Sequence, residues 1–114
     1  MSKRSKWTDF DKETKKYIKK RDNDECVICH CRGALQCMHI FMSRAQGGRG
    51  EKRNGCLGCV RCHRIIDNPL GTKENELSVK YMNYCKNYLI EKENISDAKK
   101  LMEELRFKKD KITF

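Results

Sequence analysis

Cys26-Val27-Ile28-Cys29 and Cys59-Val60-Arg61-Cys62-His63 are the two stretches that decide the fold of this chain. Two cysteines separated by two residues can place both thiolates on one tetrahedral metal ion, and two such pairs form the usual ligand set of a structural zinc. The 29 residues between the pairs exceed the 15–20 of a simple zinc ribbon, so further structure must lie between them. The zinc ligands we expect are Cys26, Cys29, Cys59 and Cys62.

The other cysteines leave alternative ligand sets open. Cys56 and Cys59 also have the two-residue separation, and Cys31 and Cys37 lie near the first pair. We prefer Cys62 because a ligand beside His63 would fix the start of a helix and the direction of the imidazole. The cysteines that remain are expected to be small buried apolar residues. They are Cys31, Cys37, Cys56 and Cys85.

Length and composition indicate one small domain, residues 1–114, with a modest core. Only 38% of residues are hydrophobic and 37% are charged, so a metal is an expected supplement to the packing. The start, Met-Ser-Lys-Arg-Ser-Lys-Trp, has no apolar run for a signal peptide or membrane span. We therefore expect a cytoplasmic chain without a membrane partner, whose thiols bind metal rather than form disulfides.

The net charge of +10 predicts a polyanionic partner such as nucleic acid. Residues 26–67 hold six of the nine arginines but only one of the 17 lysines. The planar guanidinium suits phosphate oxygens, although arginines also occur on any basic surface. The candidate nucleic-acid-binding residues are Arg44, Arg49, Arg53 and Arg64.

Residues 26–68 are expected to fold as two strands and a helix. Alternation of apolar residues around His39 predicts a strand, and three glycines in 47–50 predict a flexible turn. A second strand is expected at 54–57 and a helix from about Cys62. The predicted fold class is thus α+β: a small ββα core held by a four-cysteine zinc site and flanked by N- and C-terminal helices.

The flanking segments are expected to be helical. In residues 1–25, a disordered basic arm reaches residue 6, and a helix capped at Thr8 runs to about Arg21. In residues 72–114, Ser96 would cap a short helix that ends at Leu105. Before it, spacings of one, three and four residues predict a core-facing helical stripe. Its members are Leu77, Tyr81, Tyr84, Cys85, Tyr88 and Leu89.

The candidate catalytic residues are His39, Asn54 and His63. An imidazole with a pKa near neutrality can take a proton from water. Asn54 can brace the glycine loop through its amide, and His63 can ligate a second, catalytic cation. Asp67 lies one helical turn after His63, so both side chains can face that cation. A helix cap or a salt bridge is the alternative role for Asp67.

At these positions the chain resembles the zinc-containing HNH endonucleases of phages and bacteria, which have the ββα-metal (His-Me finger) fold. The matching run is His39-Ile40, Gly47-Gly48, Asn54-Gly55, Cys59 to His63, and Ile66-Asp67. The resemblance implies hydrolysis of DNA phosphodiester bonds with Mg²⁺ or Mn²⁺, leaving 5′-phosphate and 3′-hydroxyl ends. It also implies that His39 activates water, that Asn54 orients the loop and that His63 binds the cation.

Met38 departs from this pattern, because the family often has a metal-binding Asp or His before the base. A thioether is a poor ligand for Mg²⁺ or Mn²⁺, so Asp67 is the expected substitute. Arg44 or Arg64 is expected to neutralise charge in the transition state.

The resemblance also implies DNA as partner, a bacterial host cell, a phage-encoded chain, and packaging or recombination proteins as further partners. One such site cuts one strand, so double-strand cleavage requires a homodimer or two encounters of a monomer.

Two other functions stay open at this point. Both C-x-x-C-H motifs fit covalent haem, with Met38, Met42 and Met82 as axial partners, which would make the chain a dihaem electron carrier. The missing export signal argues against that reading. A zinc-stabilised module that binds DNA or RNA without cleaving it is the other, but binding alone does not require His39, Asn54 and His63.

Overall fold

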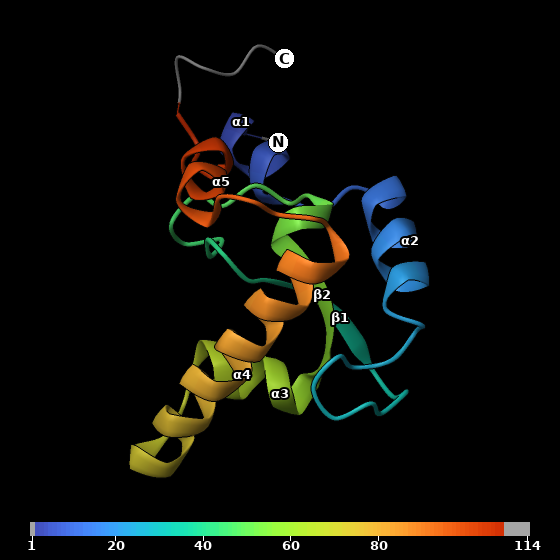
Figure 1. The fold of residues 1–114 in the computed structure, drawn as a ribbon, viewed down its shortest axis with the longest axis vertical. Coiled ribbons are helices and arrows are strands. Elements are labelled where there is room, and N and C mark those ends of the chain that lie inside the picture. Colours follow the sequence, from blue (N-terminus) through green and yellow to red (C-terminus); the bar gives the residue numbers. More distant parts are fainter. Residues whose placement is uncertain (1, 109–114) are drawn as a thin grey trace.

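Two short strands and the helix that follows them form the centre of the molecule (Figure 1). The structure is a computed structural model that describes residues 2–108. β1 (Leu35–His39) pairs antiparallel with β2 (Gly55–Cys59), which places His39 opposite Gly55. α3 (Val60–Asp67) begins directly after β2. The chain is therefore α+β, as predicted, with a two-stranded sheet and helices.

The start of α3 differs from the prediction by two residues. Cys59 is its N-cap, and the Sγ atom of Cys59 accepts a hydrogen bond from the backbone N–H of Cys62 at 3.4 Å. A sulfur atom here takes the place of the usual side-chain oxygen at a helix N-terminus. β2 accordingly extends to Cys59, and a short 3₁₀ turn, η1 (Lys52–Asn54), precedes it.

The N-terminal segment is more ordered than predicted. Residues that we expected to be a disordered arm form α1 (Lys3–Thr8), which Ser2 caps by accepting a hydrogen bond from the N–H of Ser5. The indole of Trp7 anchors this helix by donating to the carbonyl of Leu105 at 2.8 Å. The predicted cap at Thr8 is therefore wrong, because Thr8 ends α1.

A second helix, α2 (Lys12–Arg21), accounts for the rest of the predicted N-terminal helix. Asp11 is its cap, and the carboxylate accepts a hydrogen bond from the N–H of Thr14 at 2.8 Å. The predicted helix thus begins later than expected, and the helix before it lies mostly in the predicted arm.

The long helix α4 (Gly71–Lys92) contains the predicted aromatic stripe. Cys85 and Leu89 on this stripe are fully buried, but Tyr84 is 49% exposed, so the prediction that it faces the core is wrong. The N-terminal part of α4 extends away from the body of the molecule beside α3 (Figure 1). No helix in the described part of the chain is long and apolar enough to cross a membrane.

The last helix, α5 (Ala98–Leu105), has the predicted end but a different cap. Asp97, not Ser96, accepts the capping hydrogen bond from the N–H of Lys100 at 3.1 Å. Residues 109–114, which the sequence assigns to the C-terminal helical part, lie outside the described residues.

The sheet separates a large core from a small one. The large core joins β1 and β2 to α3, α4 and α5, and Met38 and Cys56 are its members from the sheet. On the other face, Phe10, Ile18 and Leu57 form a small cluster beneath α2. Successive residues of a strand point to opposite faces, so His39 lies on the opposite face of β1 from Met38.

Asp22, directly after α2, connects three elements through buried hydrogen bonds. Its carboxylate accepts from the N–H of Leu57 at 2.8 Å and from the hydroxyl of Tyr88 at 2.5 Å. The guanidinium of Arg21 lies 2.7 Å from the same carboxylate and 3.2 Å from that of Glu93. The side chains of Arg21 and Asp22 are 8% and 0% exposed, so this ion pair is buried.

Asp22→Asn should therefore lower the free energy of unfolding by about 3–5 kcal/mol, because it leaves the Arg21 charge buried without its closest partner. Urea denaturation of zinc-saturated protein measures the change. Asp24→Asn is the matched control: Asp24 is exposed, its ion pair with Lys19 is 3.8 Å long, and its replacement should change stability by less than about 0.5 kcal/mol. Equal effects of the two substitutions would contradict a structural role for Asp22.

Candidate metal centre and candidate active-site groove

The four cysteines predicted as ligands meet at one place. The Sγ atoms of Cys26, Cys29, Cys59 and Cys62 all lie within 4.8 Å of one another, and those of Cys29 and Cys59 are 3.7 Å apart. A tetrahedral zinc with bonds of about 2.3 Å would separate its sulfur ligands by about 3.8 Å. The four predicted ligands are thus close enough to hold one metal ion, and within residues 2–108 no other group of three or more such ligands gathers as closely.

Backbone geometry supports both cysteine pairs. The N–H of Cys29 donates to Cys26 Sγ at 3.5 Å, and the N–H of Cys62 donates to Cys59 Sγ. A backbone hydrogen bond from Cys31 holds the pKa of the Cys29 thiol below its ordinary value, whereas burial raises the pKa of Cys62. Zinc binding requires all four as thiolates, so the ion itself would have to stabilise the charge on Cys62.

The remaining cysteines occupy three different environments. Cys56 and Cys85 are fully buried in the large core, as predicted. Cys37 is half-buried, and Cys31 is exposed, so the prediction of burial is wrong for Cys31. The carbonyl of Cys31 accepts a hydrogen bond from the N–H of Cys26, and the exposed Cys31 thiol lies within hydrogen-bonding reach of Cys29 and Cys59.

The arrangement argues against the dihaem carrier. Its two C-x-x-C-H motifs converge on one four-sulfur cluster, whereas two haems would each need a separate pair of thioether bonds. Met38 and Met42, proposed as axial partners, are each 1% exposed and pack in the large core.

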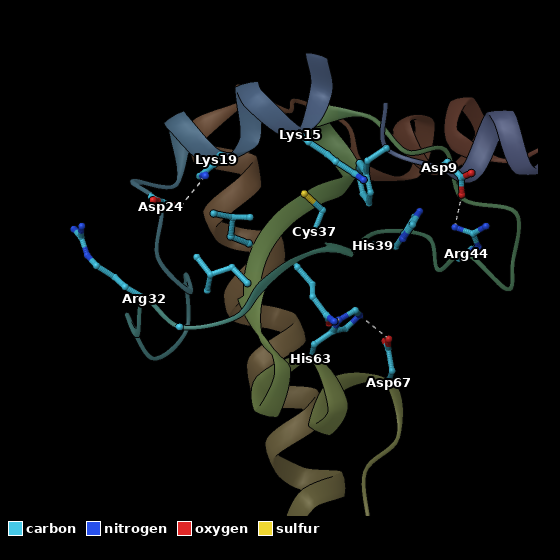
Figure 2. Close-up of a pocket in the computed structure, with 15 residues that line it drawn as sticks. Asp9, Lys15, Lys19, Asp24, Arg32, Cys37, His39, Arg44, His63 and Asp67 are labelled. Atoms are coloured by element: carbon cyan, nitrogen blue, oxygen red, sulfur yellow. Dashed lines mark hydrogen bonds and ion pairs between the residues drawn. The ribbon is translucent and has the colours of Figure 1, made fainter. Parts of the chain in front are cut away.

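A groove runs along β1 between α2 and α3 (Figure 2). Its volume is about 1090 Å³, and it brings together three of the predicted catalytic and cation-binding residues, His39, His63 and Asp67. The rest of its lining includes both charged and uncharged residues. The cationic side chains are Lys15, Lys19, Arg32 and Arg44, the acidic ones besides Asp67 are Asp9 and Asp24, and the uncharged residues are Phe10, Gly33, Leu35, Gln36, Cys37 and Leu57.

His39 ends β1 inside the groove. Its Nε2 atom lies 2.7 Å from the backbone carbonyl oxygen of Thr8, and its ring packs against Phe10 with centroids 4.5 Å apart. A carbonyl can only accept, so Nε2 carries the proton and Nδ1 of the neutral ring keeps a free lone pair. Burial lowers the pKa of His39, although the hydrogen bond to Thr8 opposes this shift. The neutral, proton-accepting form is therefore favoured at neutral pH.

His63 is held from two sides on α3. Its Nδ1 atom lies 2.6 Å from Oε1 of Gln36 on β1, and its Nε2 atom lies 2.8 Å from Oδ2 of Asp67. Figure 2 shows His63 and Asp67 on the wall of the groove opposite α2. Asp67 is the last residue of α3, where the partial negative charge of the helix C-terminus disfavours a carboxylate. The contact with His63, one helical turn away, is the interaction in the structure that can offset this cost.

Asn54 lies outside the groove and is fully buried. Its Oδ1 atom accepts a hydrogen bond from the N–H of Met42 at 3.0 Å, and its amide donates to the carbonyls of Met42 and Arg49. These bonds close the loop between β1 and η1. A Cβ atom on Gly48 would collide with the carbonyl of Met42, which explains a glycine at that point of the loop.

The predicted arginines differ in their positions. Arg44 lines the groove and pairs with Asp9, and Arg49 lies over the ring of Trp7, 4.6 Å from its centroid. Arg53 pairs with Glu51 and with Glu104 at 3.0 Å, and Arg64 makes two hydrogen bonds to Glu74, at 3.0 and 2.9 Å. Neither Arg53 nor Arg64 lines the groove, so of the four only Arg44 stands at it.

Sequence reasoning missed several groove residues. Lys15 and Lys19 line it from α2, and their four-residue spacing on a predicted helix already indicated a shared face. Gln36, which holds His63, carries no such signal. The carbonyl of Thr8 is a backbone acceptor and is independent of residue type.

No protein-family model matches the chain, and neither curated proteins nor solved structures give a match. The functional argument therefore depends on the chemistry of the site itself.

Proposed function

We propose that the chain is a divalent-metal-dependent endonuclease of the HNH type that hydrolyses DNA phosphodiester bonds. The observation that carries the proposal is the convergence of a neutral, carbonyl-anchored His39 with the His63–Asp67 pair in one groove whose lining includes four cationic side chains. The positive net charge of the chain supports a polyanionic substrate.

His39 is the general base in this proposal. Nδ1 takes a proton from water as the water oxygen bonds to phosphorus, and the bond from phosphorus to the 3′ oxygen breaks. The departing oxygen is protonated by solvent, which leaves a 5′-phosphate and a 3′-hydroxyl end. The Thr8 carbonyl keeps the ring in the tautomer that this step needs.

His63 and Asp67 fit the needs of a Mg²⁺ or Mn²⁺ ion. They offer an imidazole nitrogen and a carboxylate oxygen 2.8 Å apart, and such ions commonly complete their shell with water and substrate phosphate. Bound there, the ion would supply Lewis-acid stabilisation of the phosphate oxygens and the departing oxygen. Met38 contributes no ligand, because it is buried in the large core.

Arg44 is better placed than Arg64 to neutralise charge on the phosphate. Arg44 is about half exposed at the groove, and its partner Asp9 lines the same groove. Substrate phosphate would compete with Asp9 for the guanidinium.

Nicking of supercoiled plasmid tests the proposal. Zinc-loaded protein should convert supercoiled to open-circular DNA when Mg²⁺ or Mn²⁺ is added and should not do so without them. The buried position of Met38 favours one alternative, a zinc-stabilised module that binds nucleic acid without cutting it. Binding without nicking in any divalent ion would support that alternative.

Asp67→Asn should raise the Mg²⁺ concentration for half-maximal nicking by at least about tenfold, because it removes a charged ligand. Its stability should change by less than about 0.5 kcal/mol, since Asp67 is 58% exposed. Glu103→Gln removes an exposed carboxylate of α5 and should change neither quantity. Loss of stability with an unchanged Mg²⁺ requirement would instead make Asp67 a structural residue.

A further inference from the structure

We propose that Lys15 and Lys19 of α2 bind the phosphates of one DNA strand that lies along β1, away from the scissile phosphate at His39. This inference depends on the proposed function and extends it, because it states how the substrate lies in the groove. It also assigns phosphate binding to α2, which lies outside residues 26–67, the segment that holds six of the nine arginines.

The two lysines stand at one wall of the groove. They are four residues apart, so they lie one above the other on the same face of α2. Figure 2 shows both on α2, on the opposite side of β1 from His63. The described residues place no carboxylate within ion-pair distance of Lys15. Among the described residues, the carboxylate paired with Lys19 is that of Asp24 at 3.8 Å, an exposed pair that contributes little and can give way to phosphate.

The floor of the groove separates this wall from the catalytic one. It consists of Leu35, Cys37 and Leu57, with Phe10 beside His39. Apolar side chains suit the carbon face of deoxyribose and do not solvate phosphate. A strand in the groove would therefore turn its phosphates toward the ammonium groups of α2.

The charge of α2 agrees with this orientation. Its ten residues include five lysines and one arginine but only one acidic residue, Glu13. Arg32 continues the cationic lining past the far end of β1 (Figure 2).

The length of β1 sets the extent of the contact. Four residue steps separate Leu35 from His39, which is about 13 Å at about 3.3 Å per residue. One strand of B-form DNA advances about 3.4 Å per nucleotide, so the groove spans about four nucleotides. Two lysines one helical turn apart, about 6 Å, can contact separate phosphates within that span.

The test is the salt dependence of binding to a labelled DNA duplex, measured without added Mg²⁺ or Mn²⁺. Each lost phosphate contact lowers the slope of log affinity against log salt by about 0.9. The slope of the double variant Lys15→Gln/Lys19→Gln should therefore be shallower by about 1.8. Over a tenfold rise in salt, the factor by which its affinity falls should be about 60 times smaller than the factor for wild type. Lys15→Arg/Lys19→Arg should keep the wild-type slope, because the charges remain.

Lys16→Gln/Lys20→Gln is the matched control, since it removes two charges with the same spacing from a part of α2 that does not line the groove. It should leave the slope unchanged, and a reduction equal to that of the first double variant would overturn the proposal in favour of diffuse attraction. Zinc content and thermal unfolding verify that each variant is folded. Binding does not require cleavage, so a protein that never nicks DNA can still support this proposal. Conversely, if wild type nicks DNA but the two glutamine double variants have equal salt slopes, this proposal is overturned and the proposed endonuclease activity is not.

Discussion

Removing the metal from the four-cysteine site should unfold the protein. Structural zinc sites contribute apparent binding free energies of about 10–16 kcal/mol, which matches or exceeds the total stability of about 5–15 kcal/mol of ordinary domains. Cys59 is both a predicted ligand and the cap of α3, so its loss would also release the helix that carries His63. We expect chelation to abolish the cooperative thermal transition seen by circular dichroism, and added zinc to restore it.

Cys62→Ser should reproduce the effect of chelation, because Cys62 is fully buried in the cluster. Cys31→Ser is the matched control: the Cys31 thiol is exposed and is not among the four clustered sulfurs, so zinc content and melting temperature should hold. Elemental analysis of protein purified without added metal should find one zinc per chain. Less than half an equivalent, together with cooperative unfolding, would contradict a structural zinc.

His39→Ala should slow DNA nicking by about 10²–10⁴-fold, the usual worth of general-base assistance. Zinc content and DNA affinity should be retained, because His39 lies outside the sulfur cluster. His39→Gln keeps a side-chain N–H for the Thr8 carbonyl but has no base, so it separates loss of chemistry from loss of packing. His30→Ala, which removes an exposed histidine paired with Glu25, is the control and should nick normally. Undiminished nicking by His39→Ala would remove the proposed mechanism.

The dependence of the nicking rate on pH should also indicate that His39 is the base. A general base works when deprotonated, so nicking falls as the pH drops through the pKa of His39. Burial lowers that pKa below 6.5, so at saturating Mg²⁺ the activity should persist below pH 6.5 before it declines. A decline that begins well above pH 6.5 would indicate a different base.

The parts of the site that depend on short-range spacing could be predicted from the sequence. The cysteine pairs determine local turns, and alternation around His39 determines a strand, so both were found. Alternation alone could not show which face of β1 meets the large core. Met38 fills that face, and the predicted row of Leu35, Cys37 and His39 lines the groove.

Contacts between distant segments could not be predicted. Arg53 and Arg64 look like phosphate ligands in a composition count, but Glu104 lies 51 residues from Arg53 and Glu74 lies ten from Arg64. The buried carboxylate of Asp22 likewise meets Tyr88 only after 66 residues of chain have folded. Charge patterns reveal cations, and only tertiary structure reveals which of them are already neutralised.

The hydrogen bond between His39 and Thr8 has a consequence for how the protein tolerates change. The acceptor is a backbone carbonyl, so every residue type at position 8 supplies it. Substituting residue 8 therefore does not remove this hydrogen-bond acceptor. What it cannot tolerate is a change of register: one residue inserted or deleted between α1 and α2 would move a different carbonyl toward the imidazole. For this hydrogen bond, the number of residues in the linker is therefore constrained, whereas the identity of residue 8 is not.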